Sequence, residues 1–249
     1  MKSVALALLI ALSFASVNAQ TAPAPAKAPA AKTAPQAAPK AAAPKAAASK
    51  AAAPKAAAKG PDLLNPSTLN LKAPAIYVVR LETSKGNIDI RVVKNWAPNG
   101  ADRFYNLVLA GFYNNAYFFR NLDFMAQFGI SSRPEVAKVW DNRTMMDDRV
   151  IQSNKRGAVT FASTGQPNTR GTQVFINKLD QNRYLDDLKF APFGEVVAGM
   201  EVVDMLYGGY GSDSDRQYEI AHEGEAFIQR YFPRLDKIVK ASVIAVPEQ

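Results

Sequence analysis

The sequence predicts a mainly β domain, an antiparallel barrel or sandwich, in the part of the chain that follows residue 60. Three observations lead to this prediction. Seven or eight short runs with strand composition follow one another, separated by loops rich in Gly and Asn. Helical patterns are present, but they do not alternate regularly with the strands as a parallel βαβ sheet requires. The region is also long enough for one domain with its own hydrophobic core.

The first two predicted strands form a hairpin. Apolar and polar residues alternate over residues 75–82, and again over residues 87–92, where Ile88 and Ile90 share one face. Gly86 lies in the turn between the two runs, where a positive φ is expected. The pattern therefore predicts two antiparallel strands with one face in the core.

A helix is predicted directly after this hairpin. Pro98 suits the first helical turn, because an N–H group is not needed there. Ala101, Phe104 and Leu107 recur at helical spacing, and Gly111 is a natural stop. We expect this apolar face to pack in the core.

The remaining predicted elements are short. Strands are predicted over residues 117–119, 124–130, 157–162, 172–176 and 192–197. Helices are predicted over residues 200–207 and 220–231, and a last strand over residues 238–246. No Pro/Ser-rich gap divides this region, so a single domain is expected over residues 61–249.

Residues 1–19 have the pattern of a secretory signal peptide. Lys2 precedes an apolar run over residues 4–12, and the small residue Ala19 is the expected cleavage point. The apolar run is shorter than the about 20 residues that cross a bilayer. We therefore expect an exported protein, located in the periplasm if the cell has two membranes.

Residues 20–60 are almost wholly Ala, Pro and Lys, and they are expected to form a disordered linker. Prolines interrupt any helix that the alanines could start. The linker holds seven lysines and no acidic residue. Together with Lys2, these lysines account for the whole net charge of +8, so residues 61–249 carry no net charge.

This charge distribution excludes one class of function for the folded part. A nucleic-acid-binding domain carries a basic excess of its own, and residues 61–249 have none. No nucleic-acid partner is therefore expected for the folded domain. The Lys-rich linker could still make weak contact with anionic surfaces.

The residue inventory excludes several kinds of catalysis. The chain has no cysteine, so thiol nucleophiles and disulfides are ruled out. His222 is the only histidine, and Ala226 stands where a zinc-protease helix would carry a second one. We therefore predict no metal site and no cofactor, and we expect His222 to be a surface helix residue.

One charged residue lies in an unexpected place. Residues 118–129 place Arg120 and Gln127 among several large apolar side chains. An arginine in such a run needs a partner or a function. One alternative is an ion pair with Asp123, and the other is a binding or catalytic site. The residue pattern alone leaves both open.

A reaction without nucleophile or metal fits this inventory. Rotation about an Xaa–Pro peptide bond makes and breaks no covalent bond, yet its barrier is about 20 kcal/mol because of amide resonance. A dry apolar pocket lowers that barrier if it offers a hydrogen-bond donor to the prolyl nitrogen, which favours the unconjugated form. A guanidinium beside aromatic walls meets this requirement.

Four blocks of the sequence resemble the cyclophilin-type peptidyl-prolyl cis–trans isomerases. They cover residues 86–107, 118–127, 164–176 and 184–194, in the family's order. By this resemblance, residues 75–246 form a closed eight-stranded antiparallel barrel capped by helices. Residues 208–236 look like an insertion before the last strand.

The resemblance also implies a site on the outer face of the barrel. Arg120 would donate a hydrogen bond to the prolyl nitrogen, and Gln127 would orient the substrate backbone. The other implied substrate-binding residues are Phe124, Met125, Ala162, Ser163, Gln173, Phe175, Tyr184, Leu185 and Phe190. Tyr184 stands where the family usually has Trp, so weak cyclosporin binding is expected.

These observations predict an isomerase that accelerates rotation about Xaa–Pro bonds and assists the folding of exported proteins. Its expected partners are proline-containing polypeptides, and a monomer is expected. One alternative is a noncatalytic module that binds proline peptides as a chaperone or scaffold on a basic tether. Another makes the linker the functional element, anchoring the protein to an anionic surface.

Overall fold

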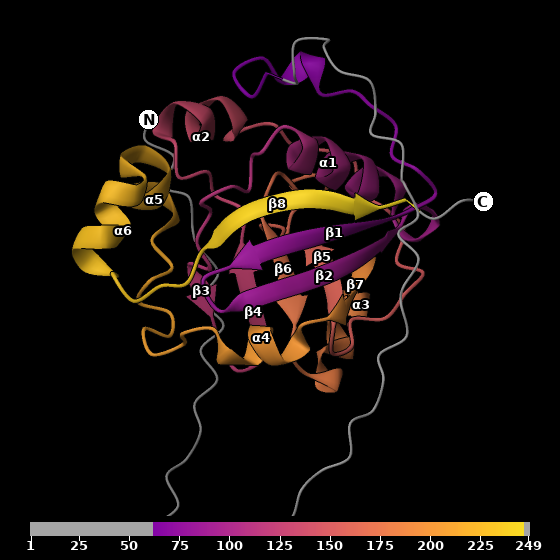
Figure 1. Cartoon of the computed structure of the whole chain (residues 1–249). Helices are drawn as coiled ribbons and strands as arrows, with labels where there is room; N and C mark the ends of the chain where they lie inside the picture. The colour runs from indigo at the N-terminus through magenta and orange to yellow at the C-terminus, as the bar shows by residue number, and fades with distance from the viewer. Residues whose placement is uncertain (1–61, 247–249) are drawn as a thin grey trace, which may run out of the picture. The chain divides into compact units, whose positions relative to one another are not determined.

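The computed structural model describes residues 62–246 (Figure 1). The predicted signal peptide over residues 1–19 and the predicted linker over residues 20–60 lie outside the described residues. The predicted domain of residues 61–249 is described except for residue 61 and residues 247–249.

Eight strands and six α-helices make up the described part of the chain. The strands are β1 (Ile76–Thr83), β2 (Gly86–Val93), β3 (Arg120–Asn121), β4 (Met125–Phe128), β5 (Ala158–Phe161), β6 (Val174–Asn177), β7 (Pro192–Ala198) and β8 (Ile238–Ala245). The helices are α1 (Pro98–Leu109), α2 (Pro134–Trp140), α3 (Tyr184–Asp187), α4 (Met200–Met205), α5 (Gln217–Glu223) and α6 (Glu225–Tyr231). Single 3₁₀ turns cover Pro66–Thr68, Lys94–Trp96 and Asp180–Arg183.

The strands form one antiparallel sheet in the order β3-β4-β6-β5-β7-β2-β1-β8. The sheet curls, as Figure 1 shows, which confirms the predicted mainly β class with eight antiparallel strands. The predicted closure into a barrel is not seen, because β3 and β8 remain the two ends of the sheet among the described residues. β3 has only two residues, too few to pair along β8. An isolated bridge between Tyr117 and Lys237 joins the segments that precede these strands.

The hairpin prediction is confirmed by the register of β1 and β2. Tyr77 lies opposite Val92, and Leu81 lies opposite Ile88, with all four side chains in the core. The turn between the strands uses Gly86 at φ +134°, a value that a residue with a Cβ rarely adopts.

Two helices cover the ends of the curled sheet. α1 runs along one end and α4 along the other (Figure 1). Both helices bury their apolar faces in the main hydrophobic core, through Phe104 and Leu107 of α1 and through Val203 of α4. The rings of Phe104 and Phe193 lie 5.0 Å apart at their centroids, which ties α1 to β7. The predicted helix after Pro98 is therefore confirmed.

Two elements near the site differ from the prediction. The strand expected over residues 117–119 is displaced, because the ladder forms at Arg120–Asn121 instead. The helix α2, Pro134–Trp140, was not predicted from the sequence. It has only seven residues and buries Val136, Ala137 and Trp140, so its apolar pattern is too short to recognise.

The helix predicted over residues 220–231 is two helices. Gly224 separates α5 from α6 with φ +65° and ψ −142°, a conformation that favours glycine. A Cβ at this position would lie 2.4 Å from the carbonyl oxygen of Ser132. The close approach of the chain before α2 therefore requires both the glycine and the break.

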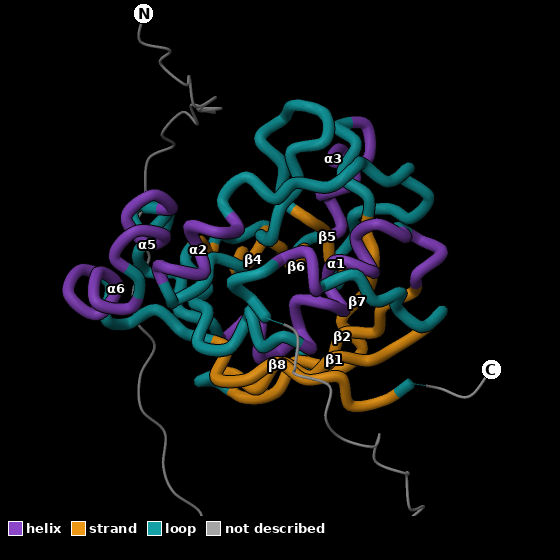
Figure 2. The backbone as a smooth tube through the Cα atoms, turned by 90° about the horizontal axis from the view of Figure 1, so that it is seen from above, coloured by secondary structure: helices purple, strands orange, loops and turns teal. Residues whose placement is uncertain are grey.

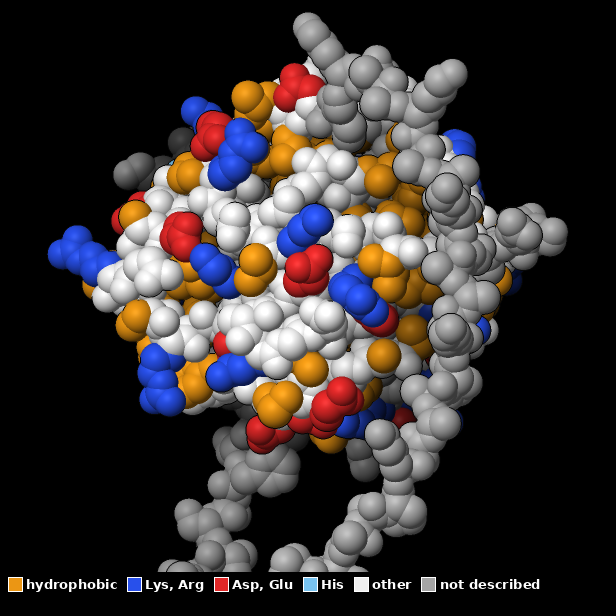
Figure 3. Space-filling view, in the orientation of Figure 1, with side chains coloured by type: hydrophobic (Ala, Val, Ile, Leu, Met, Phe, Trp, Pro, Cys, Tyr) orange, Lys and Arg blue, Asp and Glu red, His pale blue; other side chains and the backbone are white. Residues whose placement is uncertain are grey.

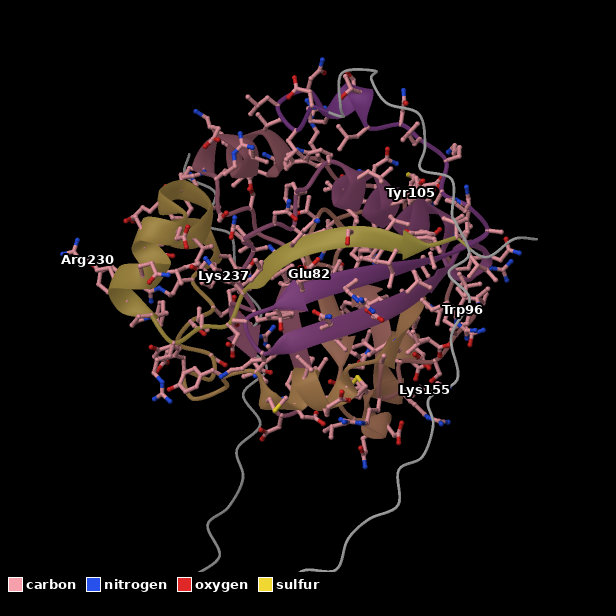
Figure 4. All side chains as sticks on the ribbon, in the orientation of Figure 1. Glu82, Trp96, Tyr105, Lys155, Arg230 and Lys237 are labelled. Carbon is pink, nitrogen blue, oxygen red and sulfur yellow. The ribbon has the colours of Figure 1, made fainter. Side chains whose placement is uncertain are left out.

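α5 and α6 have a small core of their own, which we call the second cluster. Its buried members are Tyr117, Phe119, Ile130, Ile220, Phe227, Ile228 and Leu235. Figure 2 shows α5 and α6 beside α2, away from the strands β1 and β2. Lys237, labelled in Figure 4, lies where the chain passes from these helices into β8, whereas Arg230 of α6 points away from the domain.

The described surface carries charges of both signs. Figure 3 shows Lys, Arg, Asp and Glu side chains interspersed over the face formed by β8, β1 and β2, with no large patch of one sign there. In residues 62–246, every helix is too short or too polar to cross a membrane.

Candidate functional site

Strands β3 and β4 place Arg120 and Gln127 side by side. The two residues are directly opposite each other in the antiparallel register, so their side chains leave the same face of the sheet. Nη1 of Arg120 lies 3.5 Å from Oε1 of Gln127. The tight connection between the strands is held by a hydrogen bond from the N–H of Leu122 to the carbonyl of Met125. The sequence could not show that Arg120 faces Gln127, and the register does.

Strand β6 adds two more predicted residues to this face. Phe175 lies opposite Gln127 in the pairing of β4 with β6. Gln173, just before β6, accepts a hydrogen bond at Oε1 from Nε2 of Gln127, with a length of 2.7 Å. Gln127 is itself buried, so its amide is held between a cation and a second amide.

An apolar pocket adjoins these polar groups. Met125, Phe175 and Leu185 form a buried cluster that is separate from the main core. Phe124, Ala162 and Phe190 pack against it from the half-buried rim. The rings of Phe175 and Phe190 meet edge-on with centroids 5.7 Å apart. The pocket therefore presents apolar walls on several sides of a space beside the guanidinium.

The polar pair and the apolar pocket open into one cleft with a volume of about 780 Å³. Ten of the residues predicted from the sequence line it: Arg120, Phe124, Met125, Gln127, Ala162, Ser163, Gln173, Phe175, Leu185 and Phe190. Tyr184 is the exception. Its side chain is 53% exposed and does not line the cleft. The roles assigned to these residues remain predictions.

Buried amides support the pocket from below. Asn154 is fully buried and donates from Nδ2 to Oδ1 of Asp186 at 2.7 Å and to the carbonyl of Phe190 at 2.8 Å. Asn182 donates to the carbonyl of Phe124 at 2.7 Å. These bonds fix the backbone at Phe190 and Phe124 and hold the side chain of Asp186 in the helix α3. Neither Asn154 nor Asn182 could be recognised from the sequence, because a buried amide leaves no periodic pattern.

Asp186 is ionised by its donors. Burial alone would raise the pKa of this carboxyl, but hydrogen bonds from the hydroxyl of Ser153 and from both N–H groups of Asn154 lower the pKa below its usual value. The carboxylate next to Leu185 is thus a structural anion that holds the helix α3 in place.

Phe190 is held by a buried arginine. The guanidinium of Arg170 lies 5.4 Å from the ring centroid of Phe190 and donates to the carbonyl of Lys189. Arg170 also pairs with Asp147, so its charge is compensated. This contact fixes one wall of the pocket.

Arg120 does form an ion pair, as one alternative predicted, but its partner is not the predicted Asp123. Asp123 does not pair with Arg120 in the structure, whereas Oδ2 of Asp215 lies 3.4 Å from Nε of Arg120. The Nε atom is buried and makes no hydrogen bond of good geometry within residues 62–246. Of the two terminal nitrogens, only Nη1 has a hydrogen-bond partner within these residues, and Arg120 lines the cleft.

The residues that α5 and α2 contribute to the cleft were not predicted from the sequence. Gln217, Tyr218, Ala221 and His222 line it from α5, and Ala137, Trp140 and Asp141 line it from the region of α2. His222 is exposed, as predicted, and its ring stacks on Tyr218 with centroids 3.9 Å apart. The helical pattern over residues 220–231 was recognised, but nothing in it indicated a contact with the site.

Within the described residues, no three side chains of the types His, Cys, Asp and Glu come together as possible metal ligands.

Relatives of known type match this chain. The family model described as cyclophilin type peptidyl-prolyl cis-trans isomerase/CLD matches residues 78–222. A peptidyl-prolyl cis-trans isomerase of Acinetobacter baylyi is 33% identical over 143 residues, which cover 55% of this chain and 76% of the relative. Peptidyl-prolyl cis-trans isomerase A of Dickeya dadantii is 35% identical over 133 residues, which cover 51% of this chain and 70% of the relative.

Solved structures share the fold. A cyclophilin-type peptidyl-prolyl cis-trans isomerase of Cryptosporidium parvum aligns with a TM-score of 0.50 at 20% identity, over 69% of this chain and 99% of the other. A cyclophilin from Hirschia baltica aligns with a TM-score of 0.51 at 19% identity, over 71% of this chain and 78% of the other. The family match covers more than half of the chain and contains both Arg120 and the apolar pocket. The chain belongs to the cyclophilin-type peptidyl-prolyl cis–trans isomerase family.

Proposed function

We propose that this isomerase accelerates rotation about Xaa–Pro bonds in exported polypeptides and so assists their folding. The observation that carries the proposal is the position of Arg120 and Gln127, side by side at the rim of a separate apolar pocket. A proline ring is apolar and fits walls such as Met125, Phe175 and Leu185, while the peptide backbone on either side needs polar partners.

The chemistry follows from the barrier. Resonance between the prolyl nitrogen and the preceding carbonyl is lost when the bond twists. This loss gives rotation a barrier of about 20 kcal/mol. The nitrogen lone pair then becomes a hydrogen-bond acceptor, which it is not in the planar amide. A donor aimed at that nitrogen stabilises the twisted state more than either planar state, and this difference is catalysis. Nη2 of Arg120 is the available donor.

Gln127 has a second task in this proposal. A bond can rotate only if one side of it is held while the other turns. The amide of Gln127 lies next to the guanidinium and is fixed by Gln173, so it can hold a backbone carbonyl or N–H of the substrate. The apolar pocket holds the proline ring.

Export is part of the proposal and rests on residues 1–19, whose composition is typical of a signal peptide. The Lys-rich stretch of residues 20–60 would then separate the isomerase from an anionic surface or hold it close to one. Measuring where the full chain and a chain without residues 20–60 are found in fractionated cells tests both parts.

The activity is tested with a short Xaa–Pro peptide whose cis-to-trans exchange is followed by NMR. The wild-type protein should accelerate exchange, and Arg120→Ala should lower kcat/KM about 100-fold, as for the loss of a single transition-state donor. Arg133→Ala serves as the matched control, because Arg133 is an exposed arginine whose ion pair is with Glu135. A wild-type protein that binds the peptide without accelerating exchange would instead be the noncatalytic binding module.

A further inference from the structure

A segment far along the chain reaches the catalytic pair. Residues 208–236 contribute Asp215 and Gln217 to the site, one just before α5 and one at its first position. The curled sheet and the apolar pocket are complete without this segment. What the segment adds is a set of polar contacts to side chains whose role in isomerisation is proposed above.

Five side chains form a closed ring. Nη1 of Arg120 faces Oε1 of Gln127 at 3.5 Å, and Nε2 of Gln127 donates to Oε1 of Gln173 at 2.7 Å. Nε2 of Gln173 donates to Oε1 of Gln217 at 2.8 Å. Nε2 of Gln217 donates to Oδ1 of Asp215 at 2.8 Å, and Oδ2 of Asp215 lies 3.4 Å from Nε of Arg120.

The donors and acceptors around the ring can be arranged in only one way. A guanidinium can only donate hydrogen bonds, and an ionised carboxylate can only accept them. With Arg120 at one end and Asp215 at the other, each of the three amides between them must turn its oxygen toward the arginine side and its NH₂ group toward the carboxylate side. An amide that flipped would place two donors or two acceptors against each other, so the two charged ends fix all three orientations.

The same contacts hold the guanidinium. Asp215 faces the buried Nε atom, and Gln127 faces Nη1, so two edges of the planar group are occupied. The third nitrogen, Nη2, has no hydrogen-bond partner within the described residues, and Arg120 itself lines the cleft. The side chains of Arg120 and Asp215 are 31% and 24% exposed, so water screens their attraction only in part.

We propose that Asp215 and Gln217 are positioning residues of the isomerase site, which aim the guanidinium of Arg120 and orient the amides of Gln173 and Gln127. This inference rests on the proposed function, because it assigns a role in the same reaction. Asp215 and Gln217 act through Arg120 and Gln127. Removing either should therefore slow the rotation step more than it weakens substrate binding.

The fold supports a fixed position for these two residues. α5 continues into the second cluster through the buried Ile220, and it packs beside α2. Gln217 begins this helix, and Asp215 precedes it by two residues. The ring is thus attached to a packed helix.

The decisive variant is Asp215→Asn, which keeps the size of the side chain and removes its charge. An Asn can turn an NH₂ group toward Arg120 or toward Gln217, and either orientation breaks the direction of the ring. We expect kcat to fall about tenfold, the scale of one charge-assisted hydrogen bond, with KM changed about twofold or less. Asp215→Glu, which restores the charge, should recover part of the loss.

Two controls accompany this variant. Asp213→Asn removes the same charge from the same loop. The carboxylate of Asp213 makes no hydrogen bond or ion pair within the described residues, so the kcat of this variant should equal that of the wild-type protein. In an Arg120→Ala background, Asp215→Asn should cause no further loss, because the group that it positions is absent. Gln217→Leu cuts the ring while leaving Asp215 intact and should also lower kcat.

A readout that does not need activity is the NMR signal of the Arg120 Nε–H group. In the wild-type protein this proton is buried beside a carboxylate and should exchange slowly with water, and Asp215→Asn should speed its exchange. An unchanged kcat, or a higher kcat because Asp215 had been masking Arg120, would overturn the proposal. An inactive wild-type protein would refute the proposed function instead, and the Nε–H measurement would still report whether the contact exists.

Discussion

Asp186 accepts hydrogen bonds from both the backbone N–H and the side-chain amide of Asn154, at 2.8 and 2.7 Å. The same amide donates to the carbonyl of Phe190, and its oxygen accepts from the hydroxyl of Thr160 at 2.9 Å. One fully buried side chain therefore connects strand β5 to the helix α3 and to the loop that carries Phe190. The apolar pocket depends on this connection, although Asn154 does not line it.

Asn154→Ala should destabilise the fold by about 3 kcal/mol, because it leaves the hydroxyl of Thr160 and the carbonyl of Phe190 without a buried partner. Urea unfolding measures the change. Asn142→Ala is the control, since Asn142 is exposed and its change should stay within about 0.5 kcal/mol. A loss for Asn154→Ala no larger than that of the control would contradict a supporting role for the network.

Phe124→Ala tests the apolar pocket. Phe124 is half-buried at the rim and packs against the cluster of Met125, Phe175 and Leu185, so its removal exposes a pocket wall without opening the main core. We expect kcat/KM for an Xaa–Pro peptide to fall about tenfold, because apolar contact with the proline ring is lost. Leu188→Ala, which removes an exposed side chain outside the cleft, should leave kcat/KM unchanged.

Glu225 gives the attachment of α6 a dependence on pH. Its carboxylate accepts from the hydroxyl of Tyr117 at 2.7 Å and pairs with Lys237 at 3.1 Å. The Tyr117 hydrogen bond, followed by that of Lys237, lowers the pKa of Glu225 below its usual value. Burial and the nearby carboxylate raise the pKa of Tyr117 to about 12, so the phenol remains a donor.

A carboxyl whose folded pKa is lowered stabilises the protein above its unfolded pKa, and this contribution is lost as the pH falls through the folded pKa. The contribution of Glu225 should therefore be complete above about pH 5 and should decline below about pH 4. Urea midpoints measured across this range should fall less steeply for Glu225→Gln than for the wild-type protein. Parallel curves for the two proteins would show that the pKa of the Glu225 carboxyl is the same in the folded and unfolded states.

Gly224→Ala tests the break between α5 and α6. The new Cβ would lie 2.4 Å from the carbonyl oxygen of Ser132, and the alanine would have to keep a positive φ. We therefore expect the free energy of unfolding to fall by about 3 kcal/mol or more. Gly211→Ala is the matched control, because Gly211 also has a positive φ but no neighbour within 4 Å. Its loss should be about 1 kcal/mol, from the backbone conformation alone. Similar losses in the two variants would mean that the contact with Ser132 is unimportant.

Amide hydrogen exchange shows which part of the fold is destabilised in Gly224→Ala. Faster exchange confined to α5 and α6 is expected, because the second cluster is separate from the main core. Slower isomerisation should accompany it, since α5 carries Gln217 to the cleft.

Local periodicity predicted the elements that lie in regular structure. Alternation over β1 and β2 and the helical spacing of α1 follow directly from backbone geometry, so the hairpin and its buried face were predictable. The same reasoning places Gln173 and Phe175 on one face of the strand predicted over residues 172–176. The family resemblance as a whole also indicated ten residues of the cleft, six of them in the blocks around Arg120 and Phe175.

The sequence by itself determined the strand-rich class and the buried faces, because both depend on neighbours along the chain. Most residues of the apolar pocket were indicated by the family resemblance of the sequence blocks. The tertiary structure alone decided that Arg120 faces Asp215 and not Asp123, that the sheet stays open between β3 and β8, and that α5 forms a wall of the cleft. These are contacts between segments far apart in sequence. They depend on how packed elements meet in space, and no spacing within either segment records them.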